Sequence, residues 1–368
     1  MAETTVIGGS VGDISVTVAG GGVGVINPAS QSLGNSVDRL VQFVNRQSAD
    51  PSTSASTTSY MSTFGMGDDS FSARSLDVGP QADDGSDSPF ASLGATTLTG
   101  KGSSTLVMQG VVPDGSPISQ QIIDSSDGGN KVSIDKGVAT LGQSVGDTIS
   151  ALAGLVVQGG VNSHVNSLGG HLDFIDGVGT SYISAHDAMI FGTTGSVYHF
   201  TGTSPSKVLG DDSSGSYSTF SGSMDSSGNA VHNILFDASS SHGAFAATVG
   251  DKDTIIGGAA SDTFYIDSST TASGNAGDVS ATLTGGSGAA NLFQFMDNEG
   301  GHYTITDFGS AAGNLVAFSG TQQDLMDTLK NATIEGGNTT IRLKDNTEIT
   351  FLNDTHLKNT DFKLIPSS

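Results

Sequence analysis

The stretch from Asp253 to Asp267 carries the residues with the clearest capacity for chemistry, and that chemistry is calcium binding. It contains one near-complete copy of the nonapeptide Gly-Gly-x-Gly-x-Asp-x-U-x, in which U is a large apolar residue. Calcium prefers carboxylate and carbonyl oxygens, and glycines permit positive φ and close backbone approach. Ala260 replaces the third glycine, and Phe264 takes the apolar position, which predicts that it points into a thin core. The predicted calcium-binding residues are Asp253, Gly257, Gly258, Asp262 and Asp267.

Short stacked strands must position these residues, because one turn of a parallel β-roll is too small to bury its own apolar face. A second repeat begins at residues 285–288, with Ala290 where the aspartate should be. The sequence Thr-Ile-Thr-Asp-Phe follows at 304–308, and a short apolar strand is expected at 313–318. Over residues 250–320 the chain resembles the calcium-binding RTX repeats of proteins that type I secretion systems export.

The resemblance implies an architecture and an export route, but no particular activity. RTX regions occur in lipases, proteases, toxins, adhesins and lattice proteins alike. The resemblance implies a calcium ion between successive turns, an extracellular location and an uncleaved export signal near the C-terminus. It is consistent with the N-terminal residues, which lack the positive and apolar regions of a cleavable signal peptide.

Composition points to a repetitive, acidic β protein. The 368 residues include 52 Gly and no Cys or Trp, and only 35% are hydrophobic, so the core should be narrow. The 37 acidic and 13 basic residues give a formal charge of −24. This charge argues against nucleic acid and anionic membrane surfaces as partners. It suits calcium, and it also suits simple solubility. No apolar stretch is long enough to span a membrane.

Residues 173–204 contain the clearest internal repeat, with a period of eight. A strand and a turn repeated at fixed length predict a parallel solenoid with one stacked side-chain column per position. After residue 205 the period loosens to about nine or ten. The period of eight places these residues in one column: Phe174, Tyr182, Ile190 and Tyr198.

Four segments follow from these patterns. Thr321 and Asp324 form a capping box for a short helix, and residues 339–344 and 347–351 alternate as a hairpin would. The helical spacing at 36–46 predicts another short helix. The segments are 1–46 (an N-terminal strand and a capping helix), 47–104 (rich in Ser, Thr, Gly and Asp), 105–320 (the β-solenoid, RTX-like at 250–320) and 321–368 (a C-terminal cap with the implied export signal).

Candidate catalytic groups are few. His186 and Asp187 are adjacent, with Asp173 and Asp176 nearby, and paired carboxylates are the groups that glycosidases use. Sites for acidic sugars normally need basic residues as well, yet 132–250 contains two lysines and no arginine. The Gly-x-Ser-x-Gly match around Ser144 is expected to be a turn, because no other α/β-hydrolase pattern surrounds it. The sequence therefore predicts a protein that is not an enzyme.

The predicted fold is all-β, a parallel β-solenoid or β-roll with short capping helices and a C-terminal β-hairpin cap. The predicted function is that of a secreted structural protein that self-assembles into a fibre, surface layer or biofilm matrix, with calcium-assisted folding. Solenoids favour this use because their ends are open and their faces regular. The expected partners are other copies of the chain, as an oligomer or polymer, and a cell-surface polysaccharide. Two alternatives are a polysaccharide-active β-helix enzyme and a carbohydrate-binding adhesive module.

Overall fold

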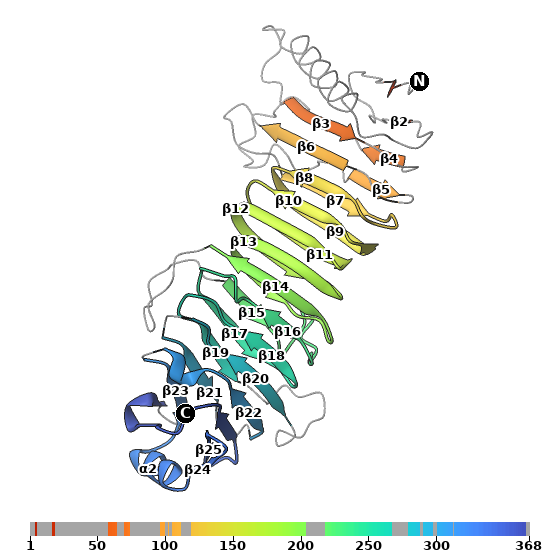
Figure 1. Cartoon of the computed structure of the whole chain (residues 1–368). Coiled ribbons are helices and arrows are strands. Elements are labelled where there is room, and N and C mark those ends of the chain that lie inside the picture. Colours follow the sequence, from red (N-terminus) through yellow and green to blue (C-terminus); the bar gives the residue numbers. More distant parts are fainter. Residues whose placement is uncertain are drawn as a thin grey trace, which may run out of the picture. The chain divides into compact units, whose positions relative to one another are not determined.

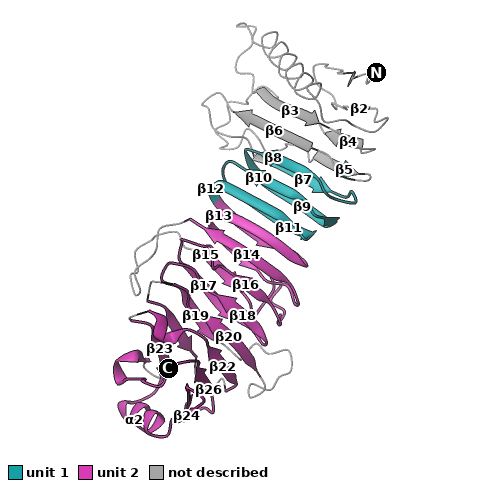
Figure 2. Ribbon diagram, viewed as in Figure 1, with its two compact units in different colours: residues 1–170 teal, residues 171–368 magenta. Residues whose placement is uncertain are grey.

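The structure is a computed structural model with two compact units, residues 1–170 and 171–368 (Figures 1 and 2). The helix predicted at 36–46, most of the strand pattern in 1–46 and the predicted calcium ligand Asp267 lie outside the described residues. The structure describes residues 4–5, 17–18, 58–64, 70–73, 96–99, 102, 105–111, 119–203, 218–266, 279–287, 290–296, 300–311 and 313–365.

Unit 1 is built from strands, and most of them pair in parallel. Strands β6, β8, β10 and β12 form one parallel ladder, and β5, β7, β9 and β11 form the other. β3 adds to β6, and β4 adds to β5, in the antiparallel sense. The strands are β1 (Thr4–Thr5), β2 (Thr17–Val18), β3 (Thr58–Phe64), β4 (Ser70–Ala73), β5 (Thr96–Thr99), β6 (Thr105–Val111), β7 (Ser119–Asp124), β8 (Lys131–Ile134), β9 (Lys136–Val145), β10 (Thr148–Ala151), β11 (Leu155–Val161) and β12 (His164–Ile175).

Unit 2 continues the same plan with short strands that come in regular succession along the chain (Figure 1). The strands before its C-terminal cap are β13 (Thr180–Phe191), β14 (Val197–Gly202), β15 (Ser218–Ser221), β16 (Leu235–Asp237), β17 (Phe245–Val249), β18 (Asp253–Ile256), β19 (Thr263–Ile266), β20 (Ser280–Thr284), β21 (Leu292–Phe295), β22 (His302–Ile305) and β23 (Leu315–Ser319). The prediction of an all-β, parallel solenoid is confirmed.

Two parallel sheets form unit 2, because each strand pairs with the second strand after it. One sheet has the order β13-β14-β16-β18-β20-β22, and the other has the order β13-β15-β17-β19-β21-β23. β13 belongs to both sheets, since residues 180–185 pair with β14 and residues 189–191 pair with β15. Each full turn of the chain therefore contributes one strand to each sheet.

The core of unit 2 lies between the two sheets, and aromatic rings dominate it. Alternate residues are buried in strands such as β17, β19 and β20, so each of these strands presents one side to the core and one to solvent. Phe264 is fully buried and stacks on Phe293 with ring centroids 4.8 Å apart. Phe220 and Phe236 stack at 4.2 Å. The prediction that Phe264 points into the core is confirmed.

The C-terminal cap, residues 321–365, interrupts this succession. It holds α2 (Gln322–Lys330), β24 (Thr333–Glu335), β25 (Asn338–Arg342), β26 (Glu348–Phe351) and β27 (Phe362–Ile365). The predicted capping box is present, because Thr321 Oγ1 accepts from Asp324 N while the Asp324 carboxylate accepts from Thr321 N. The predicted hairpin is confirmed as antiparallel β25 and β26. β26 then joins β22, and β27 joins β23, both in parallel.

Two detailed sequence expectations are wrong. Thr180 pairs with Val197, 17 residues later, so the turn is one residue longer than two repeats of eight. Tyr182 consequently lies beside His199 on the outer face, where it is 47% exposed, rather than in one column with Tyr198. Ser144, expected in a turn, is a buried residue of β9.

Candidate functional site

Asp253 is the first residue of β18, and its side chain is 1% exposed. Its two carboxylate oxygens accept hydrogen bonds from backbone N–H groups. Oδ1 accepts from Ile234 N at 2.9 Å, and Oδ2 accepts from Gly250 N at 2.8 Å. Ile234 directly precedes β16, which pairs with β18 from the preceding turn. The carboxylate therefore ties two successive turns together.

Asp262 has the same role next to the other sheet. It directly precedes β19 and is fully buried. Its Oδ1 accepts from Phe245 N, one turn earlier, and its Oδ2 accepts from Gly258 N, both at 3.0 Å. The two aspartates share no hydrogen-bond donor. Asp253 and Asp262, which are both predicted calcium ligands, therefore lie at strands of different sheets.

Burial makes both carboxylates costly to ionise. Desolvation raises the pKa of Asp253 to about 8, against the lowering effect of the Ile234 and Gly250 N–H groups. Desolvation raises the pKa of Asp262 to about 7, although Gly258 and Phe245 N–H groups favour the charged form. A bound proton or a nearby cation would remove the unfavourable charge.

The chemistry of this donor set suits calcium, because carboxylate oxygens retain acceptor capacity beyond one N–H each. Within the described residues, however, no group of three or more His, Asp or Glu side chains is placed to hold a metal ion. Asp267 lies outside those residues. The calcium-binding set therefore stays a prediction.

Gly257 and Gly258 are required by close packing rather than by backbone conformation. Neither has a positive φ, so that part of the expectation is wrong. A Cβ on Gly257 would lie 2.3 Å from Gly285 O, and a Cβ on Gly258 would lie 2.5 Å from Ser241 O. Neighbouring turns approach so closely here that only glycine fits, as the nonapeptide predicted.

Gly258→Ala is expected to lower the free energy of unfolding by about 1–3 kcal/mol, because backbone oxygen atoms must move to admit the methyl group. Gly309→Ala is the matched control, since the nearest atom to its added Cβ is a flexible side-chain oxygen at 3.4 Å. Urea unfolding followed by far-UV circular dichroism measures both variants. Equal stability of Gly258→Ala and the wild type would show that the turns are not tightly packed here.

The Asp262 contact is one rung of a ladder that sequence reasoning missed. Asp262 N donates to Asn291 Oδ1 at 2.8 Å, and Asn291 N donates to Asn314 Oδ1 at 2.8 Å. The register aligns the strands that follow these residues, so Asn291, not Ala290, corresponds to Asp262. The available signal was an Asp or Asn directly before β19, β21 and β23.

Unit 1 contains a rung of the same kind. Asn130 N donates to Asp147 Oδ1 at 2.9 Å, and each residue directly precedes a strand of one ladder. Asp147 is fully buried, and desolvation raises its pKa despite the hydrogen bond from Asn130 N. Buried acidic or amide side chains thus connect successive turns in both units.

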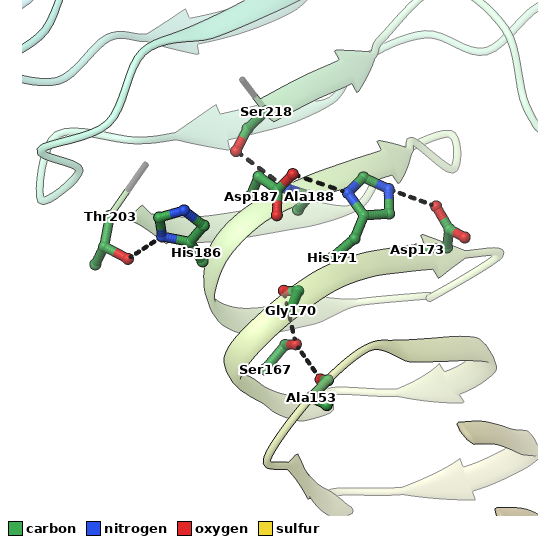
Figure 3. A network of polar contacts seen from close by, with 10 residues as sticks. All are labelled: Ala153, Ser167, Gly170, His171, Asp173, His186, Asp187, Ala188, Thr203 and Ser218. Carbon is green, nitrogen blue, oxygen red and sulfur yellow. Dashed lines mark hydrogen bonds and ion pairs between the residues drawn. The ribbon is translucent and has the colours of Figure 1, made fainter. Parts of the chain in front are cut away.

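A histidine–carboxylate cluster lies at the start of unit 2 (Figure 3). His171 Nδ1 is 3.2 Å from Asp187 Oδ2, and His171 Nε2 is 3.1 Å from Asp173 Oδ1. Both ring nitrogens of His171 therefore face a carboxylate oxygen.

The adjacent pair His186 and Asp187 does not form a unit. Successive strand residues point to opposite faces, so Asp187 is buried toward His171 while His186 is exposed near Thr203 Oγ1, at 3.5 Å (Figure 3). Asp176 instead accepts from Ser226 Oγ at 3.1 Å. The candidate catalytic residues therefore do not form one site. Asp173 and Asp187 contact His171, whereas His186 contacts Thr203 and Asp176 contacts Ser226.

The outer face of one sheet of unit 2 carries threonines in register. These threonines, which we call the threonine column, lie on six consecutive strands and alternate with buried apolar residues. The column consists of Thr254, Thr282, Thr304, Thr350, Thr340 and Thr333. Thr350 Oγ1 and Thr340 Oγ1 are 3.0 Å apart. The result is an uncharged strip on a strongly acidic protein.

Comparisons with protein-family models, with curated proteins and with solved structures found no match to this chain. Among the described residues, no helix has both the length and the apolar character needed to cross a membrane. The arguments for function therefore come from the geometry and charge of the chain itself.

Proposed function

We propose that the chain is a secreted structural protein that assembles with copies of itself into a fibre, surface layer or matrix, and that calcium assists its folding. The observation that carries the proposal is that both sheets of unit 2 end in open edges. Among the described residues, β27 pairs with β23 and β24 pairs with β25, and the far edge of each has no partner strand. Unpaired N–H and C=O groups on such an edge are a template for another chain.

Two further features support the proposal. The resemblance of residues 250–320 to RTX repeats favours export and calcium. The buried carboxylates of Asp253 and Asp262 favour a cation or a proton over a bare charge. Weak extracellular calcium modules fill at roughly 10⁻⁴–10⁻³ M, so calcium of that order outside the cell would complete folding after export.

Assembly is tested by light scattering and negative-stain imaging of refolded protein, with millimolar calcium and with a chelator. We expect filaments or sheets with calcium and smaller particles with chelator. Ile334, which is 60% exposed on β24, tests the edge directly. Ile334→Lys should reduce assembly, because a charge on an edge strand opposes strand addition.

Met224→Lys is the matched control, since Met224 is 38% exposed and lies outside the edge strands. A folded monomer in both conditions would contradict the self-assembly proposal. If assembly is the same with calcium and with chelator, only the proposed role of calcium is contradicted, and self-assembly stands.

The threonine column favours a second candidate, an adhesive module for a neutral polysaccharide. Regularly spaced hydroxyl groups without charge can hydrogen-bond to sugar hydroxyls along a chain. Co-sedimentation with insoluble neutral polysaccharides tests it, with Thr304→Lys as the variant. If the monomer binds such a polysaccharide and Thr304→Lys abolishes this binding, the adhesive module is favoured over self-assembly.

A further inference from the structure

We propose that Tyr182, His199 and Asp237, on the outer face of unit 2, bind a neutral polysaccharide with flat, apolar ring faces, as β-linked glucans have. The inference rests on the adhesive candidate function above and names side chains that hold the sugar. It does not depend on self-assembly. We call these three residues the aromatic patch.

The register of one sheet brings the aromatic patch together. Tyr182 on β13 pairs with His199 on β14, and His199 pairs with Asp237 on β16. Each of the three follows a buried residue along its strand, so its side chain points away from the core. Neighbouring strands lie about 4.8 Å apart, so the row extends about 10 Å across the sheet. This length suits contact with a sugar chain.

Tyr182 supplies an accessible aromatic ring. It is 47% exposed, and it stacks on His199 with ring centroids 4.9 Å apart and an interplanar angle of 16°. The stack holds the tyrosine side chain in place, so ligand binding costs little further rotamer entropy. A pyranose ring whose hydroxyl groups are equatorial presents C–H groups on its faces. These apolar faces can pack against the apolar body of the tyrosine ring.

Asp237 supplies a fixed hydrogen-bond acceptor beside this ring. Its Oδ1 accepts from Ser239 N at 3.0 Å, and its Oδ2 lies 3.2 Å from His199 Nδ1. Partial burial opposes ionisation, but the hydrogen bonds from Ser239 and His199 outweigh it and lower the pKa of Asp237. An ionised carboxylate has about four acceptor positions, so Asp237 can also accept from sugar hydroxyls.

The surroundings of the aromatic patch favour an uncharged ligand. Strands β13, β14 and β16 contain no Lys or Arg to pair with an acidic sugar. Asp237 and the formal charge of −24 would both repel one. Ser184 and Thr201 pair in the next outward row of β13 and β14 and add hydroxyl groups. An aromatic ring, an acceptor and hydroxyl groups without a cation suit a neutral sugar.

Electrophoresis in native gels that contain a polysaccharide tests the site, because binding slows the protein. Hydroxyethylcellulose is the neutral probe, and carboxymethylcellulose is its anionic counterpart on the same β-linked backbone. The protein is used at concentrations at which light scattering shows no assembly. Tyr182→Ala is compared with Tyr265→Ala, because Tyr265 is also an exposed tyrosine but lies on the other sheet. Circular dichroism confirms that each variant is folded.

We expect hydroxyethylcellulose to slow the wild type and Tyr265→Ala equally, and carboxymethylcellulose to slow neither. Tyr182→Ala should bind roughly tenfold more weakly, as expected when one central aromatic contact is removed. Tyr182→Phe should bind as the wild type does, because it keeps the ring. Asp237→Asn should also weaken binding, because an amide has one acceptor oxygen where the carboxylate has two.

Four outcomes would overturn the inference. Hydroxyethylcellulose that does not slow the wild type would exclude the ligand, and co-sedimentation with other neutral polysaccharides would then decide the adhesive candidate separately. Equal binding to carboxymethylcellulose would exclude a preference for neutral sugars. Equal weakening by Tyr182→Ala and Tyr265→Ala would exclude the aromatic patch as the site. Weakening by Thr304→Lys but not by Tyr182→Ala would place the sugar on the threonine column, and the adhesive candidate would stand.

Discussion

Phe264→Ala is expected to lower the free energy of unfolding by about 3–5 kcal/mol, the usual cost of removing a buried aromatic ring. Phe264 is fully buried between the sheets, in edge contact with Phe245 at 5.8 Å and stacked on Phe293 at 4.8 Å. Neighbouring turns supply these partners, so the cavity opens between turns and a narrow core has little material with which to fill it. Equilibrium unfolding in urea, followed by far-UV circular dichroism, measures the loss.

Tyr265→Ala is the control for this prediction. Tyr265 is the next residue on β19, but it points outward and is 38% exposed. Its replacement should change stability far less than that of Phe264. Similar losses in the two variants would mean that β19 does not present Phe264 to the core.

The stability of unit 2 is expected to fall as the pH rises from about 4 to about 8 in the presence of a chelator. The pKa of Asp253 rises from 3.8 to about 8 on folding, and that of Asp262 rises to about 7. The folded state therefore binds protons that the unfolded state has released. The stabilisation is complete below pH 4 and is lost as the pH passes through the folded pKa. Each group lowers the free energy of unfolding by up to about 1.4 kcal/mol per pH unit in this window.

Asp253→Asn tests the origin of this slope. The amide oxygen can still accept from Ile234 N, but the amide nitrogen faces the Gly250 N–H, so the variant should lose about 1 kcal/mol at pH 5. Its stability should then depend less on pH, and the difference from wild type should shrink or reverse at pH 8.5. Asp225→Asn is the control, because hydrogen bonds from Asn229 lower the pKa of Asp225 and place its titration below this window. An unchanged slope in Asp253→Asn would rule out Asp253 as the titrating group.

The fold class could be predicted from the sequence because its signals are local. The nonapeptide fixed Phe264 as a core residue and required glycine where turns meet. The capping box at Thr321 and the alternation of β25 and β26 depend only on neighbouring residues. Such patterns can be recognised in the sequence without knowing which strands pair.

The register between turns could not be predicted, because the length of each turn sets it. The step from Thr180 to Val197 is 17 residues, whereas that from Ser218 to Phe245 is 27. Strand periodicity says nothing about these differences. For the same reason, His171 and Asp187 meet across 16 residues, whereas the adjacent His186 does not pair with Asp187.

The ladder of buried side chains gives the stack a polarity. The backbone N–H of Phe245 donates to the side chain of Asp262. In the same way the N–H of Asp262 donates to the side chain of Asn291, and the N–H of Asn291 donates to that of Asn314. In each case a residue nearer the C-terminus supplies the acceptor for a donor nearer the N-terminus. Loss of the last turn therefore leaves a buried N–H donor without its acceptor, whereas loss of the first turn leaves a buried acceptor oxygen without its donor. The two ends of the stack are therefore chemically different, because one exposes unpaired N–H donors and the other exposes unpaired side-chain oxygen acceptors.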